Sequence, residues 1–173
     1  MVNFLKFIPR NIKAKDNATL TVWENNDVGI PVIFIHGFPE SHASWESLMT
    51  RFKSRDISQY RFILYDLRGF GDSSRSGEAS LTQFFIDHQT IISTLNLSQY
   101  HLVGHDWGGA LALHVAKFNP EQLLSLSVMN TNYWKTDIMG MWHMLFFNTP
   151  FLPSAVFKFI PDSFFKFSME GAF

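Results

Sequence analysis

The sequence predicts an α/β fold, with a mostly parallel sheet that carries helices on both of its faces. Two observations point to this class. Short, continuous apolar runs are typical of strands that are buried on both faces, as in parallel sheets. Strand and helix patterns alternate four times between residues 31 and 129, which is typical of parallel strands joined by crossover helices. The chain of 173 residues is long enough for about one such domain.

The first part of the chain predicts two strands and one helix. Residues 19–23 alternate in polarity and run into the turn-rich cluster 24–27, so we expect a strand that enters a hairpin. Residues 31–35 contain a continuous apolar run that ends at His36, and we expect a buried strand there. Apolar side chains at positions 45, 48, 49 and 52 have the spacing of one helix face.

Three more strands and two helices follow. Residues 61–65, 101–103 and 123–129 are short apolar runs and are predicted as strands. Ser80 and Gln83 form a capping box before a long apolar stripe, so a helix is expected from residue 81 to about residue 95. Another helix is expected over residues 109–118, because Pro120 ends it.

The composition changes after Asn130. Residues 133–173 hold nine of the 19 phenylalanines and are interrupted by prolines. Short aromatic helices separated by prolines are typical of a lid. We therefore expect residues 1–131 to form an α/β core and residues 132–173 to begin a helical cap.

Charge and composition bear on partners and location. Lys and Arg number 14 and Asp and Glu number 15, so the net charge of −1 gives no electrostatic reason to expect nucleic acid or an anionic membrane. No apolar run approaches the roughly 18 residues that a membrane-spanning helix needs. The N-terminus lacks the features of a signal peptide. A cytoplasmic location is the expectation.

The segment from Gly104 to Gly108 carries the strongest chemical signal. It fits the pattern of a glycine, any residue, a nucleophile, any residue and a glycine, placed between a strand and a helix. In such an elbow the central residue has strained backbone geometry and projects above the sheet, and this residue is Asp106. The dipole of the following helix favours its carboxylate form. The alternative is that Asp106 is simply the N-cap of that helix.

Cofactor and metal sites find no support in the sequence. Residues 69–74 follow a strand but lack the third glycine of a dinucleotide-binding loop, and no Lys-Ser or Lys-Thr pair follows Gly104. The seven histidines are scattered without metal-ligand spacing. His88 lies on an apolar helix face, so we interpret it as a core histidine. We expect neither a cofactor nor a metal.

A second motif, from His36 to Pro39, follows a central strand. Its glycine and proline allow the backbone to bend over the elbow, so that amides near Phe38 face Asp106. The two segments together predict an oxyanion hole made by the N–H groups of Phe38 and Trp107.

The motifs at residues 36–39, 66–73 and 104–109 together resemble the α/β-hydrolase fold superfamily, and within it the epoxide hydrolases, which are related to the haloalkane dehalogenases. The resemblance covers roughly residues 20–130, the N-terminal portion of that family, with the start of its cap beyond. It implies that Asp106 is the nucleophile, that Phe38 and Trp107 form the oxyanion hole, and that the substrate is small and apolar. It also implies a cis peptide bond between Phe38 and Pro39.

An aspartate nucleophile implies a particular reaction. A carboxylate can displace at an sp³ carbon of an epoxide or alkyl halide, which leaves an ester on the enzyme. Water, activated by a histidine base, then attacks the ester carbonyl. The resemblance thus implies a hydrolase that opens epoxides to diols, with haloalkane dehalogenation as the alternative.

The sequence departs from the family after Asp106. No residue matches the family's base histidine, its orienting acid or the cap tyrosines. We therefore expect this chain to be a truncated form of the fold and an incomplete enzyme. A non-catalytic truncated remnant or binding module is the alternative from a different class.

Overall fold

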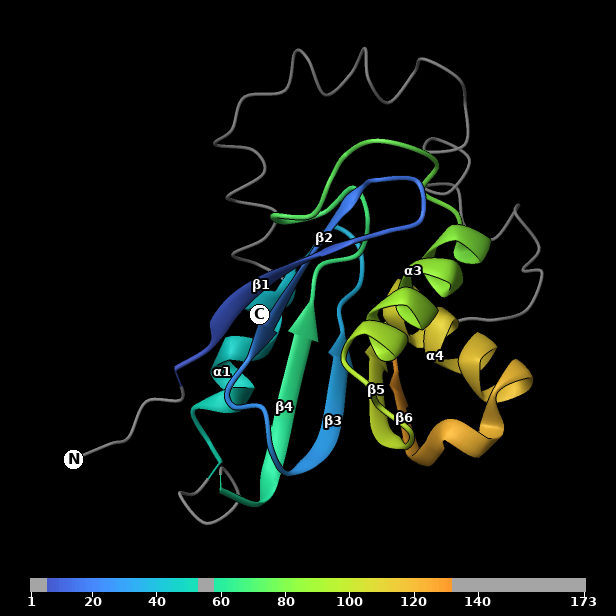
Figure 1. The fold of residues 1–173 in the computed structure, drawn as a ribbon. Coiled ribbons are helices and arrows are strands. Elements are labelled where there is room, and N and C mark those ends of the chain that lie inside the picture. Colours follow the sequence, from blue (N-terminus) through green and yellow to red (C-terminus); the bar gives the residue numbers. More distant parts are fainter. Residues whose placement is uncertain (1–5, 53–57, 132–173) are drawn as a thin grey trace. The chain divides into compact units, whose positions relative to one another are not determined.

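A six-stranded sheet forms the centre of the computed structural model, which describes residues 6–52 and 58–131 (Figure 1). Its strands lie in the order β1-β2-β4-β3-β5-β6. Strands β3, β4, β5 and β6 are mutually parallel, whereas β2 pairs antiparallel with both β4 and β1. The strands are β1 (Ile8–Lys13), β2 (Thr19–Glu24), β3 (Ile30–Ile35), β4 (Tyr60–Tyr65), β5 (Tyr100–His105) and β6 (Leu123–Met129). The predicted fold class is confirmed.

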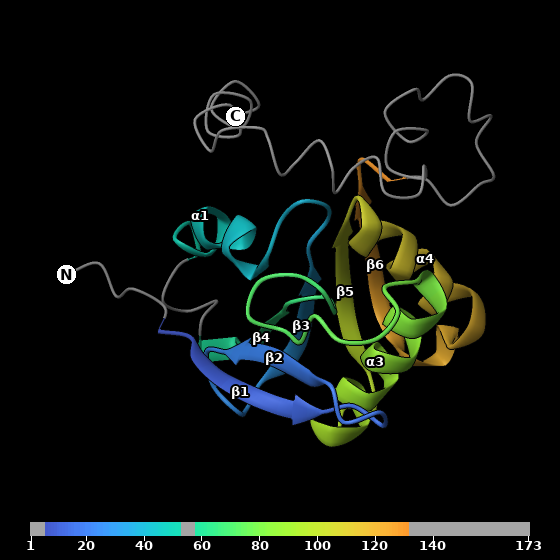
Figure 2. The same cartoon turned by 90° about the horizontal axis from the view of Figure 1, so that it is seen from above.

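Helices cover both faces of this sheet. Figure 2 shows α3 (Leu81–Thr94) and α4 (Trp107–Phe118) on one side, and α1 (Glu46–Met49) on the other. The described residues also form two 3-10 turns, η1 (His42–Trp45) and η2 (Pro120–Gln122). The range 132–173, predicted to begin a cap, lies outside the described residues.

Each central strand supplies two separate hydrophobic cores, because successive side chains point to opposite faces. In β3, Ile33 and Ile35 pack in the core beneath α3 and α4, whereas Phe34 packs with Trp45 of η1 in the second core. Continuous apolar runs are therefore needed in these strands, as the sequence pattern predicted. The parallel strands end at one edge of the sheet, and the candidate site lies at that edge.

Two sequence-based expectations need correction. Residues 19–24 do form a strand, but its hairpin partner is the preceding strand β1 and not the following one. Strand β1 was missed because only Ile12 among its side chains is buried, so it has no apolar pattern. The helix expected over residues 45–52 is only the short α1, preceded by η1.

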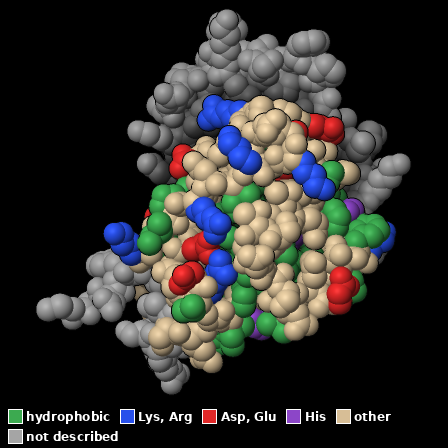
Figure 3. All heavy atoms as spheres, in the orientation of Figure 1, with side chains coloured by type: hydrophobic (Ala, Val, Ile, Leu, Met, Phe, Trp, Pro, Cys, Tyr) green, Lys and Arg blue, Asp and Glu red, His purple; other side chains and the backbone are tan. Residues whose placement is uncertain are grey.

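Helix α3 begins as predicted. The Ser80 side chain accepts a hydrogen bond from the Gln83 N–H at 3.3 Å, which is the N-terminal half of a capping box. None of the helices within residues 6–52 and 58–131 is long and apolar enough to cross a membrane. On the face seen in Figure 3, basic side chains lie among acidic and apolar ones.

His88 of α3 is a core histidine, as expected. Its Nε2 lies 2.9 Å from the Tyr100 hydroxyl, which donates to Gln122, and its Nδ1 lies 3.1 Å from the Tyr65 hydroxyl. Because the Tyr100 proton is committed to Gln122, Nε2 must carry the ring proton and Nδ1 must accept from Tyr65. The ring is fully satisfied as a neutral group, and its burial lowers the pKa of His88 to about 3.

This buried ring predicts stability that is lost in acid. An unfolded chain takes up the His88 proton near pH 6.5, well before the folded protein can. The contribution is therefore complete above pH 6.5 and declines as the pH falls towards 3, at up to about 1.4 kcal/mol per pH unit. We expect His88→Gln to reduce this slope in urea unfolding measured on both sides of that pH. Tyr65→Phe, which keeps the titrating ring, should retain it, and equal slopes in wild type and His88→Gln would contradict the assignment.

Candidate active site

Asp106 occupies a sharp turn between β5 and α4. Its backbone has φ 50° and ψ −115°, a strained conformation for a residue with a side chain. The turn is possible because its neighbours are glycines. A Cβ on Gly104 would lie 2.4 Å from the Gly108 oxygen, and one on Gly108 would lie 2.2 Å from the Ile35 oxygen. The predicted elbow geometry is therefore present.

Backbone and side-chain hydrogen bonds hold this strained residue in place. The Asp106 N–H donates to the carbonyl of Met129 at 3.1 Å, at the end of β6. The Asp106 carbonyl accepts from the Ala110 N–H at 3.0 Å and from the Thr131 hydroxyl at 2.6 Å. The elbow is thus tied to its own helix, to the neighbouring strand and to the residues that follow that strand.

The Thr131 contact is testable. We expect Thr131→Val, which is similar in shape but lacks the hydroxyl, to lower the free energy of unfolding by about 1 kcal/mol, the usual net value of one such hydrogen bond. Thr131→Ser keeps the donor and serves as the matched control. Urea unfolding measures both, and equal losses in the two variants would show that the hydrogen bond contributes nothing.

The Asp106 carboxylate is held by the loop that follows the neighbouring strand β3. The Phe38 N–H donates to Asp106 Oδ1 at 2.8 Å, although 68 residues separate them. The approach is very close, since a Cβ on Gly37 would lie 2.4 Å from the Asp106 Cβ. The Phe38–Pro39 peptide bond is cis, as predicted. By contrast, the Asp106 side chain makes no capping hydrogen bond with α4, so its role is not that of a simple N-cap.

Trp107, the second expected donor, is the first residue of α4, where backbone N–H groups have no partner inside the helix. Among the hydrogen bonds of the described residues, none joins its N–H to Asp106. Phe38, whose backbone N–H binds the carboxylate, and Trp107, which follows Asp106 in the chain, are 44% and 39% exposed. Each ring packs edge-on against another aromatic ring, Phe70 for Phe38 and Phe84 for Trp107.

Glu40 and His105 form a pair beside Asp106 that the sequence analysis missed. His105 Nδ1 lies 3.1 Å from Glu40 Oε2, and the same oxygen accepts the Gly37 N–H at 3.1 Å. The Glu40 side chain is only 13% exposed. The signal was available in principle, because Glu40 follows one motif directly and His105 precedes the elbow residue.

The loop after β4 is hydrogen-bonded to the start of η1, which follows the second motif. Asp66 is fully buried; its Oδ1 accepts from the His42 N–H at 2.7 Å and lies 3.0 Å from the His42 Nδ1, and its Oδ2 accepts from the Asp72 N–H at 2.7 Å. Burial alone would raise the pKa of Asp66, but these hydrogen bonds outweigh it, and the pKa lies below its ordinary value. Asp66 therefore joins two loops as an ionised anchor.

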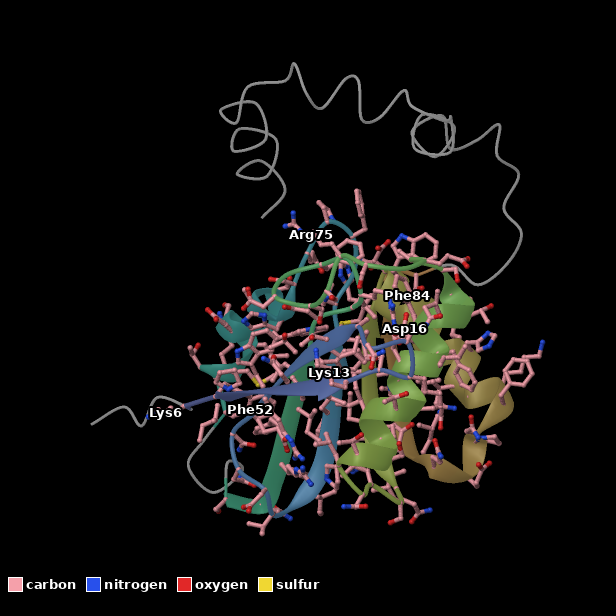
Figure 4. The ribbon with its side chains drawn as sticks, turned by 45° about the horizontal axis from the view of Figure 1, so that its top comes forward. Lys6, Lys13, Asp16, Phe52, Arg75 and Phe84 are labelled. Carbon is pink, nitrogen blue, oxygen red and sulfur yellow. The ribbon has the colours of Figure 1, made fainter. Side chains whose placement is uncertain are left out.

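Arg68 anchors the same loop to two further elements. Its guanidinium is almost fully buried and makes bidentate pairs with Asp87 of α3 and with Asp16, and its remaining N–H donates to the Ser76 carbonyl. Figure 4 shows Asp16 in the β1–β2 turn, beside α3. All five donors of the side chain are used, and the two carboxylates raise the pKa of Arg68.

No group of three or more His, Cys, Asp or Glu side chains in the described part of the chain is arranged to hold a metal ion. His36 and His88, the two histidines that are fully buried within residues 6–52 and 58–131, have their ring nitrogens engaged in hydrogen bonds with protein groups. The chemistry that the site offers is that of a carboxylate with an aligned amide donor.

A strained elbow at the end of a central parallel strand, faced by an amide from the loop after the neighbouring strand β3, defines an α/β protein of the hydrolase class. A family model for the alpha/beta hydrolase fold matches residues 30–165. The chain belongs to this family.

Several relatives are named for epoxide or dehalogenase chemistry. Mouse epoxide hydrolase 4 is 36% identical over 102 residues, which are 57% of this chain and 27% of the relative. A fluoroacetate dehalogenase from Burkholderia is 28% identical over 158 residues, 83% of this chain and 51% of the relative. The chain thus spans about a quarter to a half of the length of these two curated relatives.

Solved structures give the same picture. An epoxide hydrolase from Vigna radiata superimposes with a TM-score of 0.62 at 29% identity, covering 70% of this chain and 38% of that one. A haloalkane dehalogenase from Agrobacterium tumefaciens gives a TM-score of 0.64 at 25% identity, with coverages of 72% and 41%. The similarity to both kinds of hydrolase agrees with the resemblance that the motifs carry.

Proposed function

We propose that this chain carries the nucleophilic half of an epoxide hydrolase site, with Asp106 as the nucleophile. One observation carries the proposal furthest. Asp106 sits in a strained elbow, and one of its carboxylate oxygens is bound by the Phe38 N–H at 2.8 Å. That hydrogen bond orients the carboxylate and leaves Oδ2 to attack.

The geometry assigns different tasks to the two oxygens. Oδ2 attacks an sp³ carbon of the epoxide, and the bond between that carbon and the ring oxygen breaks. The oxygen stays on the adjacent carbon as an alkoxide, which takes up a proton from water. The product is an ester of Asp106. Oδ1 is then the carbonyl oxygen of that ester, already in contact with the Phe38 N–H, and Trp107 N–H is proposed as the second donor.

The substrate is proposed to be small and apolar, because the two residues that carry the proposed oxyanion donors, Phe38 and Trp107, are large, partly exposed apolar residues. Relatives named as epoxide hydrolases support the epoxide as the electrophile. Hydrolysis of the ester requires a base and an orienting acid, for which residues 36–131 offer no match to the family's positions. Formation of the ester is therefore the step that tests the role of Asp106 most directly, and we expect hydrolysis of the ester to be slow.

Intact mass spectrometry after incubation with styrene oxide tests this step. We expect the mass to increase by one epoxide, and digestion should place the adduct on the peptide that contains Asp106. An unmodified chain, or an adduct confined to other residues, would contradict the proposal and favour a non-catalytic remnant of the fold.

Haloalkane dehalogenation is the second candidate. It is favoured by the similarity to a haloalkane dehalogenase structure and to a fluoroacetate dehalogenase that covers 83% of this chain. The same carboxylate would displace a halide ion and form the same kind of ester. Incubation with a primary alkyl bromide, with bromide release as the readout, separates the two candidates. If the alkyl bromide alkylates Asp106 faster than styrene oxide does, dehalogenation is favoured.

A further inference from the structure

We propose that His36 is a positioning residue that aims and polarises the Phe38 N–H at Asp106. The inference rests on the proposed function, because it assigns His36 to the oxyanion site of that reaction. It is carried by a continuous series of hydrogen bonds that begins in the loop after β4 and ends on the Asp106 carboxylate.

The hydrogen bonds of His36 fix its tautomer. The ring is fully buried, and its Nε2 lies 3.0 Å from the backbone nitrogen of Leu67. A backbone N–H can only donate, so Nε2 is the unprotonated nitrogen. Nδ1 therefore carries the proton and donates it to the Gly37 carbonyl at 2.8 Å.

The Gly37 carbonyl and the Phe38 N–H belong to the same peptide unit. In a trans peptide these two groups point in opposite directions. A donor that holds the carbonyl on one side therefore aims the N–H to the other side, where it meets Asp106 Oδ1 at 2.8 Å. The Glu40 N–H also donates to this carbonyl, at 3.0 Å, so that the plane of the peptide is held by two donors.

These hydrogen bonds run in one direction, from Leu67 N–H through His36 and the peptide to Asp106. Donors and acceptors in series polarise each other, so the Phe38 N–H is a stronger donor with His36 behind it than alone. The ring must remain neutral for Nε2 to accept. Burial favours this form, since it lowers the pKa of His36, although the carboxylates of Asp66 and Glu40 act in the opposite direction.

The effect of this series differs between the two steps of the reaction. When Oδ2 attacks the epoxide, negative charge leaves the Asp106 carboxyl group, and a strong donor at Oδ1 gives no assistance. When water attacks the ester, negative charge develops on Oδ1, and the donor stabilises it. Loss of His36 should therefore slow ester hydrolysis more than ester formation.

Nuclear magnetic resonance of the labelled 173-residue chain tests the positioning directly. The ring nitrogens of His36 should show a protonated Nδ1 and an unprotonated Nε2 at neutral pH. This measurement needs no variant and no adduct, and the opposite tautomer would overturn the proposal. In His36→Phe the Phe38 amide proton should move upfield, as its hydrogen bond weakens. In His36→Asn, where an amide N–H stands at the position of Nδ1, it should return towards the wild-type value.

The lifetime of the styrene oxide adduct tests the consequence for chemistry. We expect His36→Phe to form the adduct at close to the wild-type rate but to retain it about tenfold longer. In His36→Asn the lifetime of the adduct should lie between those of His36→Phe and the wild type. His88→Gln, which alters a buried histidine elsewhere in the core, is the control and should change neither the amide shift nor the lifetime.

The possible results separate the two proposals. A wild-type chain that forms no adduct contradicts the proposed function, and the amide and tautomer measurements still decide the role of His36. A folded His36→Phe with an unchanged Phe38 amide shift overturns that role even if Asp106 is alkylated. Equal slowing of both steps also overturns it, because a general loss of structure would have that effect.

Discussion

Replacing Asp106 with alanine should abolish the adduct that the wild-type chain forms with styrene oxide. The carboxylate is the attacking group, and no neighbouring side chain shares its position in the elbow. Removal of a covalent nucleophile typically lowers rates by at least about a thousandfold. Intact mass spectrometry over a time course measures the loss, with circular dichroism to verify that the variant is folded.

A matched control distinguishes this effect from general reactivity of carboxylates. Asp27 is an exposed aspartate in the turn before β3, and Asp27→Ala should form the adduct at the wild-type rate. If Asp106→Ala is folded and is still alkylated at the same rate, then Asp106 is not the nucleophile and the hydrolase mechanism proposed for this chain is wrong.

The elbow was predictable from the sequence because its determinants are local. The sharp turn from β5 into α4 requires glycine at positions 104 and 108, since a Cβ at either position would collide with backbone atoms. The spacing of these glycines around Asp106 therefore identifies the turn without knowledge of the rest of the fold. The strands beside it were predictable for a similar reason, as burial on both faces demands continuous apolar residues.

The contacts between motifs were not predictable in the same way. Glu40 and His105 are 65 residues apart, and their pairing depends on β3 and β5 being neighbours in the sheet. Strand β1 shows the converse limit, because it pairs through backbone hydrogen bonds while most of its side chains face solvent. A search for apolar patterns cannot detect a strand of this kind.

The burial and ion pairing of Arg68 could not be predicted from the sequence. Arg68 lies in the motif at residues 66–73, and no pattern in the sequence indicates that its side chain is buried. In the structure it is only 1% exposed and joins that loop to α3 and to the β1–β2 turn. The residues that would reveal this, Asp16 and Asp87, are remote in sequence, and an arginine is rarely so buried unless it is paired.

We therefore expect Arg68→Met to cause the largest loss of stability among the substitutions considered. Methionine retains an apolar side chain of similar length but leaves the Asp87 carboxylate, which is 3% exposed, without its cation. Removing one partner of a buried ion pair costs about 3–5 kcal/mol, mainly because an unpaired charge remains in the core. Urea unfolding at neutral pH measures this loss.

Two further variants identify the source of that loss. Asp16→Asn removes the partner whose side chain is 48% exposed, and we expect a change of only about 0–1 kcal/mol. The double variant Arg68→Met with Asp87→Asn removes the stranded charge, so it should be more stable than Arg68→Met alone. If the double variant is no more stable, then lost packing and not the unpaired carboxylate explains the effect. If Arg68→Met costs less than about 1 kcal/mol, Asp87 is solvated or protonated at little expense and Arg68 is not the anchor of this loop.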